Sequence, residues 1–322
     1  MTAVPKVELH VHLEGTAPPD LIRRIAERNG LPLPEGVFAA PDRFAYTDFL
    51  DFLQTYDKAA SVIRTGEDYR DITYEYLMSC AAEGAIYVEL TASPDHAKLV
   101  GLSDEEHLDS IARGIDDARA EGGIEGRILI SCVRNFGVEP ALRVARYAAE
   151  LPHPYVVGFS MAGDEENYPP AAYAEAFEIA AAAGLGCTVH AGEWAGPESV
   201  REGLGLPVSR ICHGVRSIED PALVEELAES GTVLEVCPTS NVVLGIYPTY
   251  EEHPLPRLMD AGVRVTLGSD DPPYFGATIG GEYALCAEHF GLDDEALRGI
   301  TRTAIEAAFC EETLKQGLTQ TV

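Results

Sequence analysis

Histidine and aspartate side chains in this sequence stand where short apolar runs end. The residues that share this placement are His10, His12, His190, His213, Asp270 and Asp271. Side chains alternate between the two faces of a strand, so His10 and His12 point to the same side. A single strand histidine is most often structural, but imidazoles combined with a carboxylate suit zinc or a similar borderline metal rather than calcium or magnesium. The set predicts a metal site if the fold brings these strand ends together.

Glu193 follows His190 by three residues, in His-Ala-Gly-Glu. Gly192 permits a sharp turn, so the carboxyl group can face the same cavity as His190. A carboxylic acid that stays protonated in a dry pocket can donate a proton to a substrate nitrogen. The alternative is a glutamate at a helix N-terminus, where the helix dipole favours negative charge. We expect Glu193 to be a general acid.

The elements that must position these side chains alternate between short β-rich runs and longer helical patterns. The runs expected as strands are Val7–His12, Ala85–Thr91, Arg127–Val133, Tyr155–Ser160, Gly186–His190, Arg210–His213, Val233–Cys237 and Val263–Gly268. Strands separated by helices require right-handed crossovers and hence a parallel sheet, and eight such units favour an α/β fold of the (β/α)8 TIM-barrel type. The candidate residues then lie at the C-terminal ends of strands, where barrel enzymes keep their sites. An open doubly wound sheet would need a glycine-rich phosphate loop after the first strand, and none is present.

We expect residues 1–322 to form a single barrel domain. About 70 residues separate the first two strands, too many for one crossover. The aromatic-rich segment 31–64 is expected to be a helical insertion over the barrel mouth, either as packing or as a lid that contributes to the substrate pocket. Extra helices are also expected after Asp293, toward the C-terminus.

Composition limits the partners. The chain has 322 residues, with 53 acidic and 23 basic side chains and a formal net charge of −30. Such a protein repels phosphate backbones, so we expect neither nucleic acid nor membrane as a partner. The seven cysteines form no CxxC pair and are expected to be small buried hydrophobes in a reducing compartment. With no signal-peptide pattern and no long apolar stretch, the chain is expected to be cytoplasmic.

Motifs along the chain resemble those of the adenosine and adenine deaminase family of the amidohydrolase superfamily. They are Pro5–Gly15 (PKVELHVHLEG), Ala162–Glu165 (AGDE), His190–Glu193 (HAGE), His213–Arg216 (HGVR), Cys237–Asn241 (CPTSN) and Ser269–Pro272 (SDDP). They run in the family's order from the N-terminal strand to the region just after Asp271. Together they are highly specific, and they imply a zinc-dependent aminohydrolase acting on a 6-aminopurine.

The resemblance also implies a role for each residue. Zinc would be held by His10, His12, His190 and Asp270, and an activated water would add to C6 of the purine. Glu193 would protonate ring N1, His213 would orient the water and stabilise its developing charge, and Asp271 would hydrogen-bond the water or purine N7. The residues expected to contact the substrate are His12, Glu14, Gly163 and Asp271.

The lysines argue for one metal ion per chain. Binuclear barrel hydrolases commonly bridge two metals with a modified lysine at the end of a mid-barrel strand. The lysines here are Lys6, Lys58, Lys98 and Lys315, and none ends the expected fourth strand. We therefore expect one Zn²⁺ and one activated water.

The substrate follows less directly from the motifs. Ala162–Glu165 and Ser93-Pro94 look like the adenosine-specific form, whereas Glu14 looks like the adenine-type or modified-nucleoside form. We expect adenosine or 2′-deoxyadenosine as the substrate, converted to inosine or 2′-deoxyinosine plus ammonia. The alternatives are adenine and a 5′-modified adenine nucleoside such as an aminodeoxyfutalosine-like compound. More distant alternatives are another amino-heterocycle and a non-catalytic binding protein, although Glu193, His213 and Asp271 are all present.

Overall fold

The computed structural model describes residues 3–150 and 153–322. Its central parallel sheet contains eight strands that follow one another in chain order: β1 (Lys6–His12), β4 (Ala85–Ala92), β5 (Glu125–Val133), β6 (Val156–Ala162), β7 (Gly186–Ala191), β8 (Arg210–His213), β9 (Val233–Val236) and β10 (Arg264–Leu267). Just beyond β10, a parallel bridge between Val11 and Asp270 joins the last strand to the first. The predicted α/β barrel is confirmed, and each predicted strand lies where the hydrophobic runs placed it.

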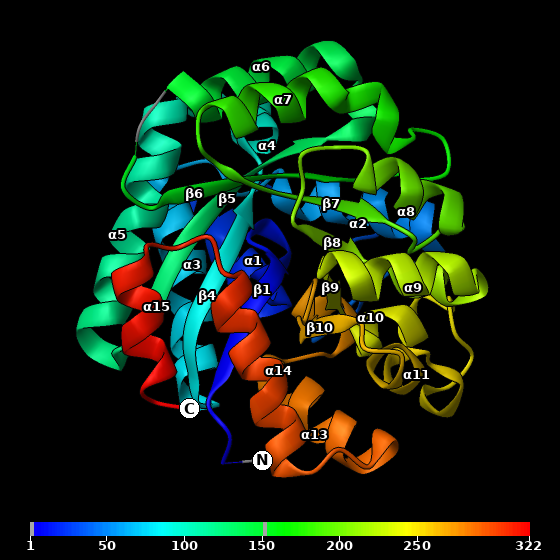
Figure 1. The fold of residues 1–322 in the computed structure, drawn as a ribbon. Coiled ribbons are helices and arrows are strands. Elements are labelled where there is room, and N and C mark those ends of the chain that lie inside the picture. The colour runs from blue at the N-terminus through cyan, green and yellow to red at the C-terminus, as the bar shows by residue number, and fades with distance from the viewer. Residues whose placement is uncertain (1–2, 151–152) are drawn as a thin grey trace.

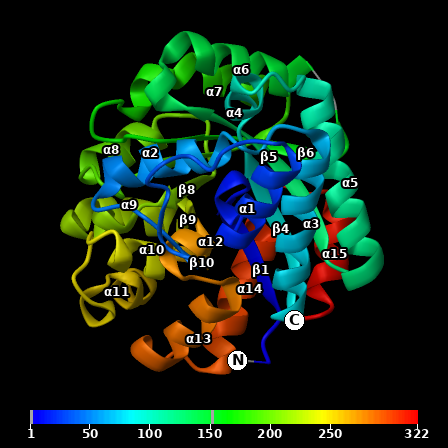
Figure 2. The same cartoon turned by 180° about the vertical axis from the view of Figure 1, so that it is seen from behind.

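Helices surround the strands (Figures 1 and 2). Their bounds are α1 (Pro19–Arg28), α2 (Phe49–Ala60), α3 (Gly66–Ala82), α4 (Pro94–Leu99), α5 (Asp104–Gly122), α6 (Val138–Glu150), α7 (Ala174–Ala182), α8 (Pro197–Leu204), α9 (Pro221–Ser230), α10 (Pro238–Val243), α11 (Leu255–Asp260), α12 (Pro272–Phe275), α13 (Ile279–Phe290), α14 (Asp294–Ala307) and α15 (Glu312–Thr319). Over the described ranges, none of these helices combines the length and the apolar character that a bilayer crossing requires.

Local sequence signals fix several helix ends. The side chain of Ser103 accepts a hydrogen bond from the backbone N–H of Glu106 at the start of α5, and Gly123 ends this helix in the left-handed conformation with φ 69°. A capping box between Thr65 and Asp68 begins α3 in the same manner. These caps explain why the helical periods in the sequence begin and end where they do.

The segment 31–64 differs in detail from the expected helices. It contains a short antiparallel hairpin, β2 (Phe38–Ala40) with β3 (Arg43–Phe44), followed by α2. The strands of this hairpin are too short to produce a readable period of two, which is why sequence patterning missed them. The ring of Phe44 stacks on Tyr274 with a centroid distance of 4.0 Å, so the hairpin is anchored to the segment that follows β10.

Ionic groups fill part of the barrel interior beneath the strand ends. Arg210 is fully buried, with its Nη2 2.7 Å from Glu89 Oε2 and its Nε 2.5 Å from Glu235 Oε1. A buried guanidinium is tolerated when carboxylates pair with it and satisfy its donors. The backbone carbonyl of Glu235 in turn contacts His10, so this network supports the end of the barrel that carries the candidate residues.

Candidate active site

Four of the predicted residues place their donor atoms around one point at the C-terminal end of the barrel. His190 Nε2 lies 3.1 Å from His10 Nε2 and 3.3 Å from His12 Nε2. Asp270 Oδ1 lies 3.4 Å from His10 Nε2 and 3.3 Å from His12 Nε2. Each strand-one histidine therefore neighbours both His190 and Asp270, although these side chains come from β1, from β7 and from the residues after β10.

Backbone carbonyls orient two of the imidazoles. Nδ1 of His10 lies 3.2 Å from the carbonyl oxygen of Glu235, and Nδ1 of His190 lies 2.9 Å from that of Met161. A carbonyl can only accept, so Nδ1 carries the proton in both rings and Nε2 presents a lone pair. Metal-binding histidines are commonly held in this way. Burial and the neighbouring histidines also lower the pKa of His190 well below its usual value, which keeps it neutral.

The backbone is strained at two of the candidate residues. Among the described residues other than glycine, only His213 and Asp270 have positive φ, at 59° and 64°. This conformation costs roughly 1–3 kcal/mol for such residues and is concentrated at functional sites. In Asp270 it leaves Oδ2 to accept a hydrogen bond of 2.6 Å from the hydroxyl of Ser240 while Oδ1 faces the histidines. Although burial opposes ionisation, the neighbouring imidazoles of His10 and His12 hold the pKa of Asp270 well below its usual range.

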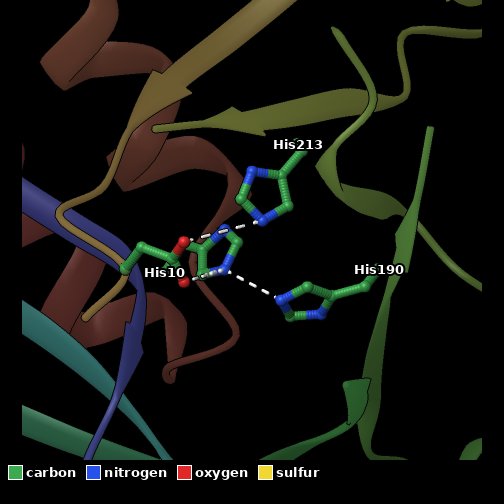
Figure 3. A group of neighbouring side chains, drawn as sticks. His10, His190 and His213 are labelled. Atoms are coloured by element: carbon green, nitrogen blue, oxygen red, sulfur yellow. Dashed lines mark hydrogen bonds and ion pairs between the residues drawn. The ribbon is translucent and has the colours of Figure 1, made fainter. Parts of the chain in front are cut away.

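The donor set fits a metal ion. Neighbouring donors around an ion such as zinc, bound at about 2.0–2.1 Å, lie about 3 Å apart, as these atoms do. His213 also approaches, because one donor atom from each of His10, His190, His213 and Asp270 lies within 4.8 Å of the others. Figure 3 shows the imidazoles of His10, His190 and His213 converging.

His213 differs from His12 in its contacts. Its Nε2 is buried without a hydrogen-bond partner among the described residues, 3.6 Å from Glu193 Oε2 and 3.9 Å from Asp270 Oδ2. His12 Nε2 lies 3.3 Å from both His190 Nε2 and Asp270 Oδ1. The four-residue group whose donors all lie within 4.8 Å of one another contains His213 instead, and His12 forms a second such group with Asp270 and Asp271.

Glu193 lies in a turn that one buried carboxylate organises. The carboxylate of Glu165 accepts hydrogen bonds from the backbone N–H groups of the four residues that follow Ala191, including Glu193 at 3.1 Å and Trp194 at 2.8 Å. It also accepts a hydrogen bond from the hydroxyl of Ser199. Glu165 thus fixes the backbone from which Glu193 projects.

Glu193 has the electrostatic surroundings of a carboxylic acid that retains its proton. It is buried and lines the cavity. Burial, reinforced by the negative charges of Asp270, Glu165 and Asp271, raises its pKa well above the usual value. A protonated carboxyl group at this position can donate a hydrogen bond or a proton to a bound heterocycle.

Asp271 lies beside the cluster, with one donor oxygen within 4.8 Å of those of His12 and Asp270. Its Oδ1 is buried and has no hydrogen-bond partner within the described part of the chain. The carboxylate rests against Gly15, where an added Cβ would lie 1.8 Å from Oδ1, so any larger residue would displace it. This explains the glycine at the end of the first motif.

A cavity with about 680 Å³ of empty space, part of it open to solvent, lies above the cluster. One half, the metal half, is lined by His12, His190, Glu193, His213, Asp270 and Asp271. The other half, the aromatic half, is lined by Phe49, Phe52, Leu53, Tyr56, Asp57 and His96. The metal half comes from strand ends, and the aromatic half comes from α2 and α4.

Glu14 lies at the wall of this cavity and is held by protein groups. Its Oε1 accepts a hydrogen bond of 3.2 Å from the backbone N–H of Ser93 and one of 3.4 Å from the hydroxyl of Tyr69. The hydroxyl of Tyr56 lies 3.5 Å from the other oxygen. Burial raises the pKa of Glu14.

Gly163 also lines the cavity, but its neighbour Asp164 is turned away. Gly163 has φ 110°, and a side chain there would collide with Asn135. Asp164 accepts hydrogen bonds from the backbone N–H and side-chain amide of Asn167, at 3.1 and 2.8 Å. In the AGDE motif, Asp164 therefore orders its own loop, and Glu165 orders the turn that carries Glu193.

Sequence reasoning missed the residues that hold the site from behind. Arg134 is fully buried and donates a hydrogen bond of 2.6 Å to the carbonyl oxygen of His190, and Glu165 orders the following turn. Asn241 contacts His213, and His253 contacts Asn241. Glu165 and Asn241 stand inside the AGDE and CPTSN motifs, so these motifs were a usable signal. Arg134 and His253 stand outside every motif named above.

Comparisons with known proteins agree with this geometry. The sequence profile described as adenosine deaminase matches residues 5–322. The chain is 49% identical to an adenine deaminase of Chelativorans sp. over 97% of this chain and 96% of that protein, and 45% identical to an adenine deaminase of Sinorhizobium medicae over 99% and 98%.

Two crystal structures are similar over nearly the whole chain. The adenine deaminase of Arthrobacter aurescens shares 29% identity with a TM-score of 0.91, covering 99% of this chain and 98% of that one. An amidohydrolase of Burkholderia ambifaria with bound Zn shares 26% identity with a TM-score of 0.89, covering 99% and 92%.

Proposed function

The chain belongs to the adenosine and adenine deaminase family of the amidohydrolase superfamily, and on that basis we propose that it hydrolyses adenine to hypoxanthine and ammonia. The observation that carries this proposal is the 49% identity to an adenine deaminase over almost the full length of both chains. The buried histidine–aspartate cluster supports it together with Glu193, whose pKa burial raises well above its usual value, because hydrolytic deamination needs an activated water and a proton donor.

The prediction of adenosine or 2′-deoxyadenosine as the substrate, which the AGDE motif favoured, is wrong. The curated relatives named above are adenine deaminases, and so is the similar Arthrobacter structure. The misleading signal has a physical explanation, because Asp164 bonds to Asn167 and does not line the cavity. The contrary signal, Glu14, does line the cavity and is the more informative residue about the substrate.

We propose zinc as the metal, one ion per chain, with His10, His12, His190 and Asp270 as its ligands. The spacing of their donor atoms supports this set, as does the zinc in the Burkholderia relative. Zinc in such a site supplies a water molecule that loses its proton near neutral pH.

The chain's own residues would then complete the reaction. Glu193 donates its proton to ring N1, which draws electrons away from C6 while water adds there. His213 donates a hydrogen bond to the attacking oxygen, and Asp271 accepts a hydrogen bond from the water or faces purine N7. Gly163 offers its backbone N–H to the purine edge. Of the two protons of the water, one passes to the amino group and the other returns to Glu193. When the tetrahedral C6 centre collapses, the C–N bond breaks, ammonia leaves and the 6-oxo purine keeps the proton at N1.

We propose that the segment 31–64 closes the mouth of a single barrel domain and limits the space beyond the purine base. In support, α2 supplies Phe49, Phe52 and Tyr56 to the cavity wall. Asp57 on the same helix lies 2.9 Å from His96 Nε2 on α4, which ties the two sides of the aromatic half together. A base without a sugar needs no room on this side.

We also propose that the enzyme works in the cytoplasm on this small-molecule base. Its seven cysteines are all free and buried, as is typical of a reducing compartment.

The proposal is tested by steady-state turnover of zinc-loaded protein on adenine, adenosine and a 5′-modified adenine nucleoside, measured by loss of adenine absorbance and by ammonia release. We expect kcat/KM for adenine to exceed the values for both nucleosides by on the order of 10²-fold or more, because the full-length relatives named above are adenine deaminases. Equal or faster turnover of a nucleoside, or no turnover of adenine, would contradict the proposal.

A further inference from the structure

A chain of buried side chains leads from the backbone of α11 to His213. The backbone N–H of Leu255 lies 3.2 Å from His253 Nδ1, and His253 Nε2 lies 3.1 Å from the side-chain oxygen of Asn241. The side-chain nitrogen of Asn241 lies 3.2 Å from His213 Nδ1. Both Asn241 and His253 are buried, so water does not compete for these contacts.

The direction of every hydrogen bond in this chain follows from its first member. A backbone N–H can only donate, so His253 Nδ1 must accept and the proton of its neutral ring is on Nε2. That proton is donated to the amide oxygen of Asn241, which turns the amide NH₂ group toward His213. His213 Nδ1 must then accept, and the proton of a neutral His213 is on Nε2. The amide orientation thus follows from its partners.

The other side of the His213 ring supports the same tautomer independently. Its Nε2 has no hydrogen-bond partner within the described residues and faces Glu193 Oε2 at 3.6 Å and Asp270 Oδ2 at 3.9 Å. A proton on Nε2 is attracted to the ionised carboxylate of Asp270, whereas a lone pair there would face it unfavourably. Both ends of the ring therefore favour the same proton position.

We propose that Asn241 and His253 are positioning residues that hold the proton of His213 on Nε2, so that His213 serves the attacking oxygen as a hydrogen-bond donor and not as a proton acceptor. This inference rests on the proposed deamination. It gives a role to the buried Nε2 of His213, which has no hydrogen-bond partner among the described residues: this atom is available to donate to the attacking oxygen. It also gives the CPTSN motif a function through its last residue.

The packing around His253 keeps the relay in one state. Its ring stacks on Phe290 at a centroid distance of 5.8 Å and meets Tyr247 edge-on at 5.1 Å. Burial lowers the pKa of His253 to about 3, so it carries a single proton at neutral pH. A second proton, on Nδ1 of His253, would be repelled by the backbone N–H of Leu255, which points at the same atom.

The test combines ¹⁵N NMR of histidine-labelled, zinc-loaded enzyme with turnover of adenine. Long-range ¹⁵N–¹H spectra distinguish the two tautomers, and His213→Gln identifies the signals of His213. We expect a protonated Nε2 and an unprotonated Nδ1 in the wild-type enzyme. A proton on Nδ1 of wild-type His213 would overturn the proposal.

Asn241→Asp probes the relay without a change of shape. Its carboxylate accepts from His253 with one oxygen and from His213 with the other, so we expect a proton to appear on His213 Nδ1. We expect kcat for adenine to fall about 10–100-fold, the effect typical of outer partners of a metal site, with KM changed much less and zinc content unchanged. His253→Phe, which leaves the amide of Asn241 free to turn, should give mixed tautomers and a smaller loss of kcat.

Gln316→Glu on the exposed face of α15 makes the same amide-to-acid change and serves as the control. A shifted proton in Asn241→Asp with wild-type kcat would overturn the proposed role of the tautomer, and an unshifted proton would overturn the relay. The spectrum is recorded without substrate. A wild-type enzyme that leaves adenine unchanged would therefore refute the deaminase function and the role of this relay in it, while the tautomer is decided by the spectrum alone.

Discussion

The two halves of the cavity are built differently. In the metal half, the functional side chains stand at strand ends, and buried groups such as Arg134, Glu165 and Ser240 hold them in place. In the aromatic half, the walls come from α2 and α4, and the ion pair that joins these helices includes Asp57, whose side chain is 57% exposed. The comparison suggests that the reaction depends on the barrel, whereas the choice of substrate depends on segments added to it.

The largest effect is expected from His12→Ala in the metal half. Removing one imidazole of the proposed ligand set should abolish stoichiometric zinc binding and lower turnover by more than about 10⁴-fold, because the activated water is lost together with the metal. Metal analysis and adenine turnover measure both effects. The exposed His289→Ala variant should retain zinc and activity. Full zinc occupancy in His12→Ala would remove His12 from the ligand set.

Glu193→Gln should separate proton donation from metal binding. The amide keeps the size of the side chain but cannot deliver a proton in the same way, so we expect kcat to fall by about 10²–10⁴-fold with zinc fully retained. Glu198→Gln, on the exposed surface of α8, is the matched control. Near wild-type turnover in Glu193→Gln would show that another group supplies the proton.

Glu165→Gln tests whether the metal half depends on its buried support. One acceptor oxygen becomes an NH₂ group that faces backbone N–H donors of the turn that holds Glu193, and each buried donor left unpaired costs about 1–3 kcal/mol. We expect a lower free energy of unfolding by denaturant titration and a reduced kcat. The neighbouring Glu166 is exposed, so Glu166→Gln should change neither quantity. Unchanged stability in Glu165→Gln would refute this account of the turn.

The smallest effect is expected in the aromatic half, from Asp57→Asn. The pair with His96 is partly exposed, and such pairs contribute at most about 1 kcal/mol, which corresponds to about a fivefold change in KM. We expect kcat to stay near the wild-type value, with Asp42→Asn in the same segment as control. A loss of kcat as large as that of Glu193→Gln would contradict the proposed separation of the two halves.

The sequence alone was sufficient for the barrel and for the position of the cluster. Strand periodicity placed His10 and His12 on one face, and the rule that parallel strands end on the same side brought His190 and Asp270 to them. Arg134 and His253 could not be found in this way, because each acts through one tertiary contact between segments distant in sequence. Local patterns carry no record of such contacts.

The substrate was mispredicted for a related reason. The motif Ala162–Glu165 resembles the adenosine-specific form, but Asp164 bonds within its own loop and does not line the cavity. The walls of the aromatic half depend on how α2 packs across the barrel, and no short motif specifies that packing. Substrate choice was therefore harder to predict than reaction type.

The central claim is that the cluster at the strand ends is a metal centre that hydrolyses adenine. Its most direct test is a titration of metal-free wild-type protein with zinc while adenine turnover is recorded. The account predicts no turnover without metal and a linear rise that ends when each chain has received a single ion. Full turnover in the metal-free protein, or a rise that continues to a second ion per chain, would contradict it.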